Sequence, residues 1–337
     1  EPAISVVMPA YNAERYLDQA IQSILDQDFQ NFEFIIIDDA STDNTLSLLN
    51  AFATKDQRIK IHCNVENLGV AESLNLGFKM ARGRYIARMD ADDISLPQRF
   101  SKQAAFLDAN SDFAFVGTGY QIINADGRIT RTDIEATEAW ECEWMSIFRM
   151  PVIHPSMMIR ASIVQSMSVI YDNSFEGAED YDLAQRLLKL GKGKALSEVL
   201  FQYRMHDESV SAIKSEIQKT LKPRITQQNK PGVVDQCNPE EIFDFFRETY
   251  ADPQSVYRAT IFLAKIEKLC ATDWRLSFAQ RQKMRAFSIR WLFSAAMISG
   301  RLQKPNQFLS FFWHSRAYAR AYLSEAISYF SRRIQRG

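Results

Sequence analysis

Residues 4–41 read ISVVMPAYNAERYLDQAIQSILDQDFQNFEFIIIDDAS, and this stretch decides the fold class. Its two apolar runs, residues 4–8 and 32–37, have the length and the β-branched content of strands that are buried on both faces. Between them, apolar side chains recur at helical spacing over residues 13–27. A strand, a helix and a second strand in this order predict two parallel strands joined by a right-handed crossover.

The same alternation continues beyond residue 41. Helical periodicity over residues 41–53 and 70–81 alternates with short strand-like runs at residues 59–62 and 84–89. Farther along, the pattern predicts strands at 113–123, 128–132 and 156–159 and helices at 96–109, 135–150 and 179–190. We therefore expect an α/β fold with a Rossmann-like, doubly wound and mostly parallel sheet. Its ligand site should lie beyond the carboxyl ends of the strands.

Composition narrows the function classes. The 337 residues include 40 Lys or Arg and 41 Asp or Glu, which excludes a globally basic nucleic-acid binder. The four cysteines form no CxxC pair, so neither a zinc knuckle nor a disulfide framework is expected. No apolar stretch reaches the roughly 18 residues of a membrane span. We expect a cytoplasmic protein, either soluble or bound at the inner face of the plasma membrane.

The chain is expected to have two folded parts. Residues 1–215 form the predicted α/β domain, residues 216–238 a polar linker containing Pro223 and Pro231, and residues 239–337 a helical, basic region. From residue 271 to the end there are 12 Lys or Arg and 2 Asp or Glu. Aromatic and basic residues mix over 305–334, which fits packing against the α/β domain, a homodimer interface or peripheral membrane contact.

Polar residues gather where the predicted strands end. Asp90, Asp92 and Asp93 follow one strand and provide the hard oxygen ligands that Mg²⁺ or Mn²⁺ prefers. Tyr11 follows another strand, where its ring could stack on a base. Each feature also fits a simple capped turn between a strand and a helix. Because they share one sheet edge, together they predict a metal–nucleotide site.

Five motifs in order resemble those of family 2 glycosyltransferases, and the resemblance covers roughly residues 3–210. The motifs are Ile4-Ser5-Val6-Val7-Met8-Pro9-Ala10-Tyr11-Asn12, Ile37-Asp38-Asp39-Ala40-Ser41-Thr42-Asp43, Glu66-Asn67-Leu68-Gly69, Asp90-Ala91-Asp92-Asp93 and Glu179-Asp180-Tyr181-Asp182-Leu183. The resemblance implies a GT-A fold and an inverting transfer of a hexose or N-acetylhexosamine from a nucleotide diphosphate, most often UDP. It also implies a hydroxyl acceptor on a glycan or a lipid-linked molecule, in the synthesis of bacterial surface polysaccharide.

The resemblance also assigns the donor side of the site. By position, Pro9, Tyr11 and Asp39 should line the uracil and ribose pocket. Asp38, Asn12 and Asn67 should lie beside that pocket. With Gly69, Asn67 opens a helix whose amino-terminal amides could lie near the nucleotide.

The acidic motifs receive separate roles. Asp90 should contact the ribose or the donor sugar, Asp92 should hold the metal on the diphosphate, and Asp93 should act through water or bind the sugar. Asp180 matches the catalytic base, which must remove the acceptor proton on the face opposite the leaving diphosphate. Glu179, on the acceptor side, either raises the basicity of Asp180 by like-charge repulsion or caps the helix.

Histidine and arginine residues leave alternatives open. The resemblance places His206 at the metal or the phosphate, and the alternative is a solvated loop residue. His154, followed by Pro155, either faces the acceptor side or makes a structural hydrogen bond. Arg204 and Arg88 either pair with the diphosphate or lie on the surface.

Aromatic residues and departures from the family pattern complete the sequence reading. Trp140, Trp144 and Phe148 share a helical face that predicts core packing or stacking on an acceptor sugar. Ala40 stands where glycine is frequent, Leu74 where many members carry arginine, and Tyr181 where tryptophan is common. Two other classes remain: a non-catalytic nucleotide-sugar-binding scaffold, and a nucleotidyltransferase that would release pyrophosphate.

Overall fold

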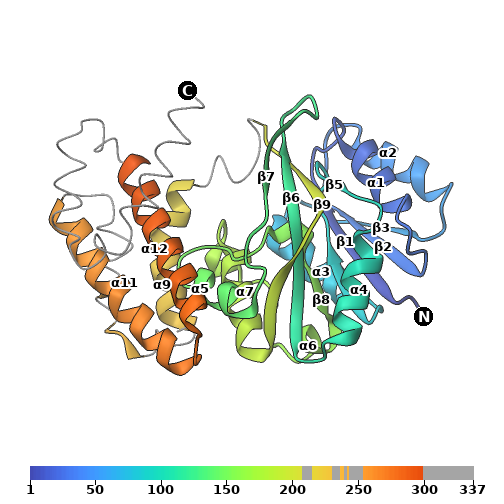
Figure 1. Cartoon of the computed structure of the whole chain (residues 1–337). Helices are drawn as coiled ribbons and strands as arrows, with labels where there is room; N and C mark the ends of the chain where they lie inside the picture. Colours follow the sequence, from blue (N-terminus) through green and yellow to red (C-terminus); the bar gives the residue numbers. More distant parts are fainter. Residues whose placement is uncertain (207–214, 230–235, 239–240, 243–252, 299–337) are drawn as a thin grey trace. The chain divides into compact units, whose positions relative to one another are not determined.

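The computed structural model of the chain describes residues 1–206, 215–229, 236–238, 241–242 and 253–298. The chain divides into two compact units, Glu1–Leu221 and Lys222–Gly337. The first unit holds every described strand, and the second holds α11 (Pro253–Asp273) and α12 (Phe278–Ile298), which contact each other (Figure 1). Helix α9 (Ser215–Asn229) begins at the last residue of the predicted α/β domain, covers much of the segment predicted as a linker and contains Pro223. The predicted helix that starts at Pro305 lies outside the described residues.

The described strands form one nine-stranded sheet in the order β3-β2-β1-β4-β8-β6-β9-β5, with β7 paired to β6. Their bounds are β1 (Ile4–Ala10), β2 (Phe32–Asp38), β3 (Ile59–Cys63), β4 (Tyr85–Arg88), β5 (Ile94–Ser95), β6 (Phe113–Ile123), β7 (Ile129–Asp133), β8 (Met158–Arg160) and β9 (Lys192–Arg204). Strands β3, β2, β1 and β4 are parallel, while β8 runs antiparallel to β4 and β6. The predicted α/β class and its mostly parallel sheet are confirmed.

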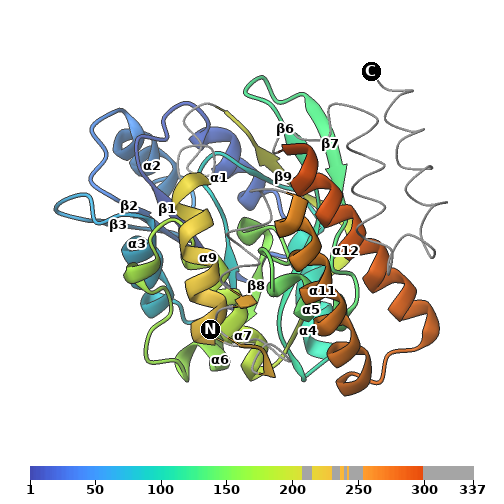
Figure 2. The same cartoon turned by 90° about the vertical axis from the view of Figure 1, so that its left-hand side faces the viewer.

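Helices cover both faces of this sheet. They are α1 (Leu17–Leu25), α2 (Thr45–Ala53), α3 (Val70–Met80), α4 (Arg99–Ala109), α5 (Ala139–Ser146), α6 (Ala161–Gln165) and α7 (Glu179–Leu190), with the short turns η1 (His154–Ser156) and η2 (Asn173–Phe175). Val6 and Ile36 join the buried cluster that includes Ile21 of α1 and Phe100 of α4. The opposite face packs against α3, which lies beside β1 and β2 (Figure 2). Side chains on both faces of β1 and β2 are therefore buried, which explains why these strands are largely apolar.

The close packing of α3 depends on one glycine. A Cβ atom added to Gly77 would lie 2.4 Å from Cγ1 of Val7, well inside van der Waals contact. The absence of a side chain at this position lets the helix approach β1 and β2. This approach fixes the amino end of α3 beside the loop that follows β2, where predicted donor-side residues lie.

Several predicted boundaries were wrong for identifiable reasons. The helix predicted at 135–150 spans only α5, and the positive φ of Ala136, 52°, precludes a helix across that residue. The helix predicted from residue 96 begins at Arg99, because Leu96 donates its main-chain N–H to Leu200 beside the β5–β9 pairing. Strand β9, which was not predicted, runs parallel to β6 and brings Arg204 and His206 to the same region as the acidic motif.

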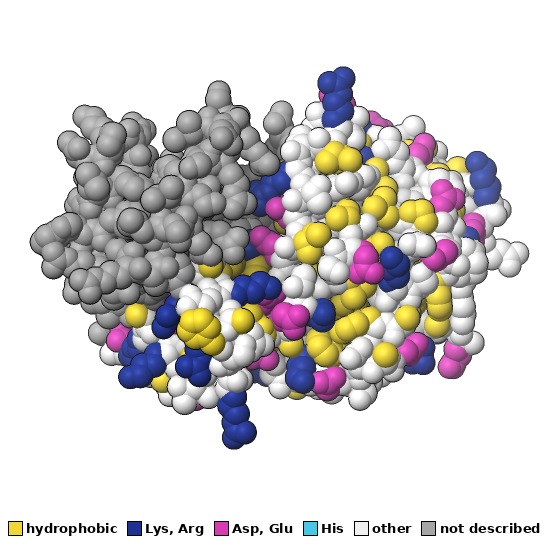
Figure 3. Space-filling model, viewed as in Figure 1, with side chains coloured by type: hydrophobic (Ala, Val, Ile, Leu, Met, Phe, Trp, Pro, Cys, Tyr) yellow, Lys and Arg dark blue, Asp and Glu magenta, His cyan; other side chains and the backbone are white. Residues whose placement is uncertain are grey.

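The remaining expectations concern packing and surface. Trp144 and Phe148 are buried with ring centroids 5.1 Å apart, which confirms core packing for these two residues, whereas Trp140 is only partly buried. The four cysteines are free thiols. Within the described parts of the chain, no helix combines the length and hydropathy needed to cross a bilayer. On the face shown in Figure 3, acidic and basic side chains of the first unit are interspersed with apolar ones.

Candidate active site

Three aspartates converge just beyond the end of β4. Carboxylate oxygens of Asp90, Asp92 and Asp93 lie within 4.8 Å of one another. Asp90 and Asp92 are partly exposed, with 28% and 33% of their side-chain surface accessible, whereas Asp93 is completely buried. Two carboxylates therefore face solvent at the carboxyl edge of the sheet, above a third that does not.

His206, two residues beyond the end of β9, joins this cluster. Its Nε2 lies 3.0 Å from Oδ2 of Asp92, and its ring lies 5.3 Å from that of Tyr16. Carboxylate oxygens beside an imidazole nitrogen are a donor set that suits Mg²⁺ or Mn²⁺. The residues present thus fit a divalent cation, and the structure brings the predicted ligands Asp92 and His206 together.

The cluster is electrostatically unfavourable without a bound cation. Burial, together with the negative charge of Asp90, raises the pKa of Asp92, although His206 partly opposes the shift. Burial also raises the pKa of Asp93 well above its usual range, and the charges of Asp92 and Asp90 add to this effect. Like charges that are close and partly desolvated disfavour the ionised form, and a bound cation would relieve this cost.

Arg204 lies beneath the cluster and is almost completely buried. Its main-chain N–H donates to Oδ1 of Asp93 at 2.8 Å, and its Nε donates to the carbonyl of Asp92 at 2.7 Å. Its Nη2 donates to Oε1 of Gln19 at 2.8 Å. The burial of Arg204 excludes the surface position that was one of its two alternatives, and its pairing with the diphosphate stays a prediction. The contacts of Arg204 suit a residue that positions the acidic loop.

Asp39 organises the predicted nucleotide side. Its Oδ1 accepts hydrogen bonds from Leu68 N at 2.9 Å and Asn64 Nδ2 at 2.7 Å, while its Oδ2 accepts from Gly69 N at 2.8 Å. Gly69 has a φ of 85° as the N-cap of α3, a conformation that glycine adopts readily. The buried Asp39 carboxylate therefore ties the loop before α3 to the end of β2.

The loop after β1 is tied to the loop after β2. Asn12, with a φ of 47°, accepts at Oδ1 from Thr42 N at 2.8 Å and donates its main-chain N–H to Ser41 Oγ at 3.0 Å. Ala40 has a φ of 59°, so alanine occupies a left-handed conformation where family members often carry glycine. Tyr11 is exposed between these anchored positions, which leaves its ring accessible.

The other donor-side residues lie along the same strand ends. Pro9 pairs with Ile37 in the β1–β2 register. Asp38 is buried, and its Oδ1 has no hydrogen-bond partner within the described residues. Asn67 is exposed two residues before Gly69. The structure thus brings all the predicted donor-side residues of β1, β2 and the loop before α3 to one edge of the sheet.

The predicted catalytic base lies in the first turn of α7. Asp180 is partly exposed and accepts from Tyr181 N at 2.7 Å. Glu179 is buried and accepts from the main-chain N–H of Gly177, which favours its capping role over the alternative. Tyr181, the residue that replaces tryptophan, is buried and donates to the carbonyl of Ile147 at 2.8 Å.

Tyr171 connects this turn with the acidic cluster, and sequence reasoning missed it. Burial raises its pKa, the charges of Asp180, Glu179 and Asp90 contribute in the same direction, and Arg88 opposes them. The phenol therefore lies close enough to both acidic groups to experience their fields. A single tyrosine in a loop of mixed composition carried no sequence signal for this place.

His154 makes the structural hydrogen bond that was one of its two alternatives. Its Nε2 lies 2.9 Å from the hydroxyl of Tyr171. Burial lowers the pKa of His154 well below its usual range, and the positive charge of Arg88 adds to this effect. His154 is therefore neutral at pH 7 and packs beside the cluster as an uncharged hydrogen-bonding group.

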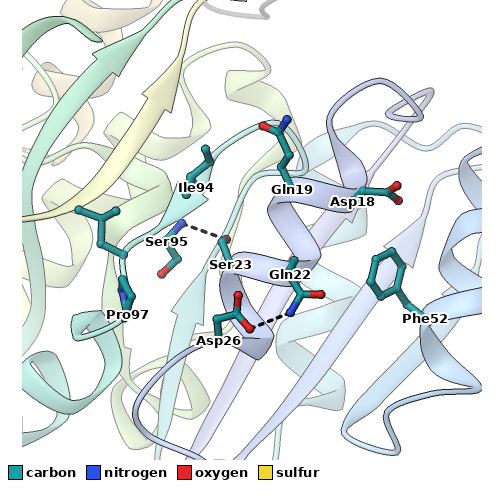
Figure 4. Close-up of a pocket in the computed structure, with 10 residues that line it drawn as sticks. Asp18, Gln19, Gln22, Ser23, Asp26, Phe52, Ile94, Ser95 and Pro97 are labelled. Atoms are coloured by element: carbon teal, nitrogen blue, oxygen red, sulfur yellow. Dashed lines mark hydrogen bonds between the residues drawn. The ribbon is translucent and has the colours of Figure 1, made fainter. Parts of the chain in front are cut away.

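A separate groove lies behind α1. It has a volume of about 550 Å³ and is bounded by α1, Phe52 of α2 and the segment from Ile94 to Pro97 (Figure 4). Gln22 donates to Asp26 at 2.7 Å along its wall. None of the predicted site residues lines this groove.

Comparison with known proteins also identifies glycosyltransferases as relatives of this chain. Residues 5–169 match the Glycosyl transferase family 2 model. An uncharacterized glycosyltransferase of Haemophilus influenzae is 35% identical over 237 residues, covering 68% of this chain and 73% of the relative. The Bacillus subtilis protein named putative teichuronic acid biosynthesis glycosyltransferase TuaG is 31% identical over 224 residues, covering 64% of this chain and 83% of the relative.

Solved structures share the fold at low sequence identity. TarS 1-349 of S. aureus in complex with UDP-GlcNAc gives a TM-score of 0.58 at 16% identity, covering 96% of this chain and 92% of the other. The mannosyltransferase PcManGT of Pyrobaculum calidifontis, in complex with GDP-Man and Mn²⁺, gives a TM-score of 0.55 at 16% identity, covering 95% and 86%. These likenesses support the GT-A fold.

Proposed function

The chain belongs to glycosyltransferase family 2, and from this premise we propose that it transfers a hexose or N-acetylhexosamine from a UDP-sugar to an acceptor hydroxyl, with inversion and with a divalent cation. One observation carries the proposal. Three carboxylates with oxygens within 4.8 Å of one another lie beside His206 at the carboxyl edge of the sheet. That edge is where open α/β sheets bind their ligands.

Asp92 and His206 are the residues that would hold Mn²⁺ or Mg²⁺. When bound, the cation would supply Lewis-acid stabilisation of the charge that develops on the leaving diphosphate. Asp90, which is partly exposed beside Asp92, is placed to contact the ribose or the donor sugar. Asp93 supports the loop from below through its hydrogen bond with Arg204 N, in place of a direct contact with the sugar.

Asp180 is the proposed general base. Inversion requires a carboxylate that takes the acceptor proton on the face opposite the leaving group. The first turn of α7 favours the ionised carboxylate through the helix dipole, and Glu179 completes that turn by capping.

The nucleotide side is proposed to be preformed. Asp39 holds the loop at residues 64–69 through three hydrogen bonds, and Asn12 holds the loop after β2. Tyr11 presents an accessible ring for stacking on the base. Asp38, Pro9 and Asn67 complete this edge beside the ribose.

The biological setting follows from the relatives and forms part of the proposal. The name of one relative refers to teichuronic acid biosynthesis, which supports a role in bacterial surface polysaccharide. A glycan or lipid-linked acceptor and a cytoplasmic location accompany this role. The aromatic and basic residues at 305–334 that suggested membrane contact or dimerisation lie outside the described residues.

A donor panel tests the proposal. The full chain is incubated with Mn²⁺ and several nucleotide sugars, and released nucleotide is measured by a coupled assay with and without EDTA. We expect EDTA-sensitive release of UDP from one UDP-sugar in the presence of a hydroxyl acceptor. Release that EDTA leaves unchanged would contradict the metal requirement. Release of pyrophosphate would instead identify a nucleotidyltransferase.

A further inference from the structure

Arg88 is a buried cation at the base of the acidic cluster. It is the last residue of β4, only 4% of its surface is exposed, and its guanidinium forms an ion pair with Asp90. Its Nε has no hydrogen-bond partner within the described residues. A guanidinium held away from water with an incomplete set of acceptors is costly, so this arrangement needs a compensating interaction.

Two other buried arginines near the cluster, Arg99 and Arg204, direct their guanidinium groups to neutral acceptors. Arg99 is buried and directs Nη2 to the carbonyl of Arg88 at 2.7 Å, and Nε to the side chain of Gln103. Arg204 directs its Nε to a main-chain carbonyl of the acidic loop. Among the described residues, Arg88 is therefore the arginine whose guanidinium forms an ion pair with a carboxylate of the cluster.

Two other described groups near Arg88, His154 and Tyr171, carry no charge that would compete with the aspartates for its guanidinium. His154 is neutral, because burial and the charge of Arg88 lower its pKa. Tyr171 donates or accepts as an uncharged phenol, because burial raises its pKa. Asp90 pairs with Arg88, and the charges of Asp90 and the buried Asp93 both favour the guanidinium. The electrostatic interactions of Arg88 are thus directed mainly at the acidic cluster.

We propose that Arg88 is an internal counter-cation, which pairs with Asp90 in the absence of donor and so makes capture of the divalent cation depend on the donor's diphosphate. This inference rests on the proposed function. A fixed positive charge a few ångströms from the carboxylates lowers their affinity for another cation. The diphosphate restores the negative charge and adds oxygen ligands. By linkage, the cation must then strengthen binding of the diphosphate by the same factor.

The proposal is tested by Mn²⁺ binding rather than by turnover. The full chain and the variants Arg88→Met and Arg88→Lys are titrated with Mn²⁺, by electron paramagnetic resonance of the free ion, without nucleotide and with UDP. We expect Arg88→Met to bind Mn²⁺ alone about tenfold more tightly than wild type, and to gain less affinity when UDP is added. Arg88→Lys keeps the charge and should stay close to wild type.

A matched control distinguishes the effect of the Arg88 charge on Mn²⁺ affinity from the effect of the protein's net charge. Arg84→Met removes a surface guanidinium four residues away, which pairs with Asp108 and is 60% exposed. It should leave Mn²⁺ affinity unchanged. Circular dichroism and thermal unfolding establish that each variant is folded, and Arg88→Gln replaces Arg88→Met if the latter does not fold.

Two results would overturn the inference. One is wild-type or weaker Mn²⁺ binding by a folded Arg88→Met or Arg88→Gln protein. The other is an equal gain in Arg84→Met. Failure of the proposed function gives a different result, because wild type would then show no mutual enhancement between UDP and Mn²⁺.

Discussion

Glu33 lies near the amino end of the parallel strands, whereas Asp93 lies beyond their carboxyl end, and both carboxylates are buried. Glu33 accepts from Ser5 Oγ at 2.7 Å and forms ion pairs with Lys60 and Arg82. Burial alone would raise its pKa, but these three partners outweigh burial and lower the pKa to about 2. Asp93 accepts a hydrogen bond from Arg204 N, and burial with the charges of Asp92 and Asp90 raises its pKa well above the usual range.

The opposite pKa shifts of Glu33 and Asp93 distinguish a carboxylate that stabilises the fold from carboxylates that are suited to binding a ligand. At the amino end, cationic and hydroxyl partners make the carboxylate stabilising. At the carboxyl end, three carboxylates crowd together, and burial and neighbouring negative charge disfavour the ionised forms of Asp92 and Asp93 until a ligand compensates them. Within one sheet, the direction of the pKa shift thus indicates which end is committed to the fold and which end to a ligand.

Replacement of Asp180 should have the largest effect at the carboxyl end. We expect Asp180→Asn to reduce kcat by about 10³-fold, because the amide cannot take the acceptor proton, and to leave UDP affinity within about twofold. Steady-state kinetics and UDP calorimetry measure the two quantities. Asp182→Asn, in the same helical turn but paired with Arg186, is the matched control and should keep turnover. Normal turnover by Asp180→Asn would sink the proposed mechanism.

Replacement of Asp92 should weaken donor binding, whereas replacement of Asp180 lowers turnover. We expect Asp92→Asn to weaken Mn²⁺-dependent UDP binding by about a hundredfold, because the variant loses a carboxylate that faces the predicted metal position. Asp108→Asn, which alters a surface carboxylate paired with Arg84, should leave that binding unchanged. The assignment fails if Asp92→Asn retains the enhancement by Mn²⁺.

Glu33→Gln should lower stability without affecting the site. At pH 7 we expect a loss of about 2 kcal/mol in the free energy of unfolding, since the paired carboxylate is replaced by a neutral amide. The folded pKa is depressed to about 2 from a usual value of 4.5, so this stabilisation is present above pH 4.5 and is lost as pH falls toward 2. Urea unfolding from pH 7 to pH 3 should show the difference between variant and wild type narrowing. A difference that grows with acid would contradict the comparison.

Asp93→Asn should show the opposite pH dependence and the smallest effect. Because the folded pKa of Asp93 is raised, the wild-type protein is favoured at low pH and loses that advantage as pH rises above the usual value of 3.8. In EDTA, the variant should therefore gain stability relative to wild type between pH 4 and pH 7. The amide oxygen can still accept from Arg204 N. Urea unfolding across this range measures the trend, and a relative loss toward neutral pH would reverse the assignment.

Much of the fold was predictable because its signals are local. The alternation of apolar runs and helical spacing located β1 through β4 and α4 within a few residues but missed the two-residue strand β5, and the Asp-rich strand ends indicated the correct sheet edge. The sequence KGKALSEVLFQYR of β9 lacks a clean period, because exposed and buried residues follow no strict alternation along this strand. Its pairing with β6 is a long-range interaction that local periodicity does not reveal.

The site was predictable in its residue types but not in their partners. The aspartates and His206 carried motif signals, whereas the connections through Arg204, Tyr171 and Arg88 depend on the three-dimensional fold. Arg88, for example, precedes the acidic motif by two residues and could equally have faced solvent. In the fold, β4 pairs with β8 and contacts the η1 turn, and Arg88 is buried beside Asp90.

The most direct test of the central claim is calorimetric titration of UDP into wild type, Glu33→Gln and Asp92→Asn, each with Mn²⁺ and with EDTA. The account predicts that Mn²⁺ strengthens UDP binding at least tenfold in wild type and in Glu33→Gln, and that Asp92→Asn loses this enhancement. UDP binding of equal strength with Mn²⁺ and with EDTA in the wild-type protein would contradict the claim that the carboxyl-end acids hold a cation for the donor.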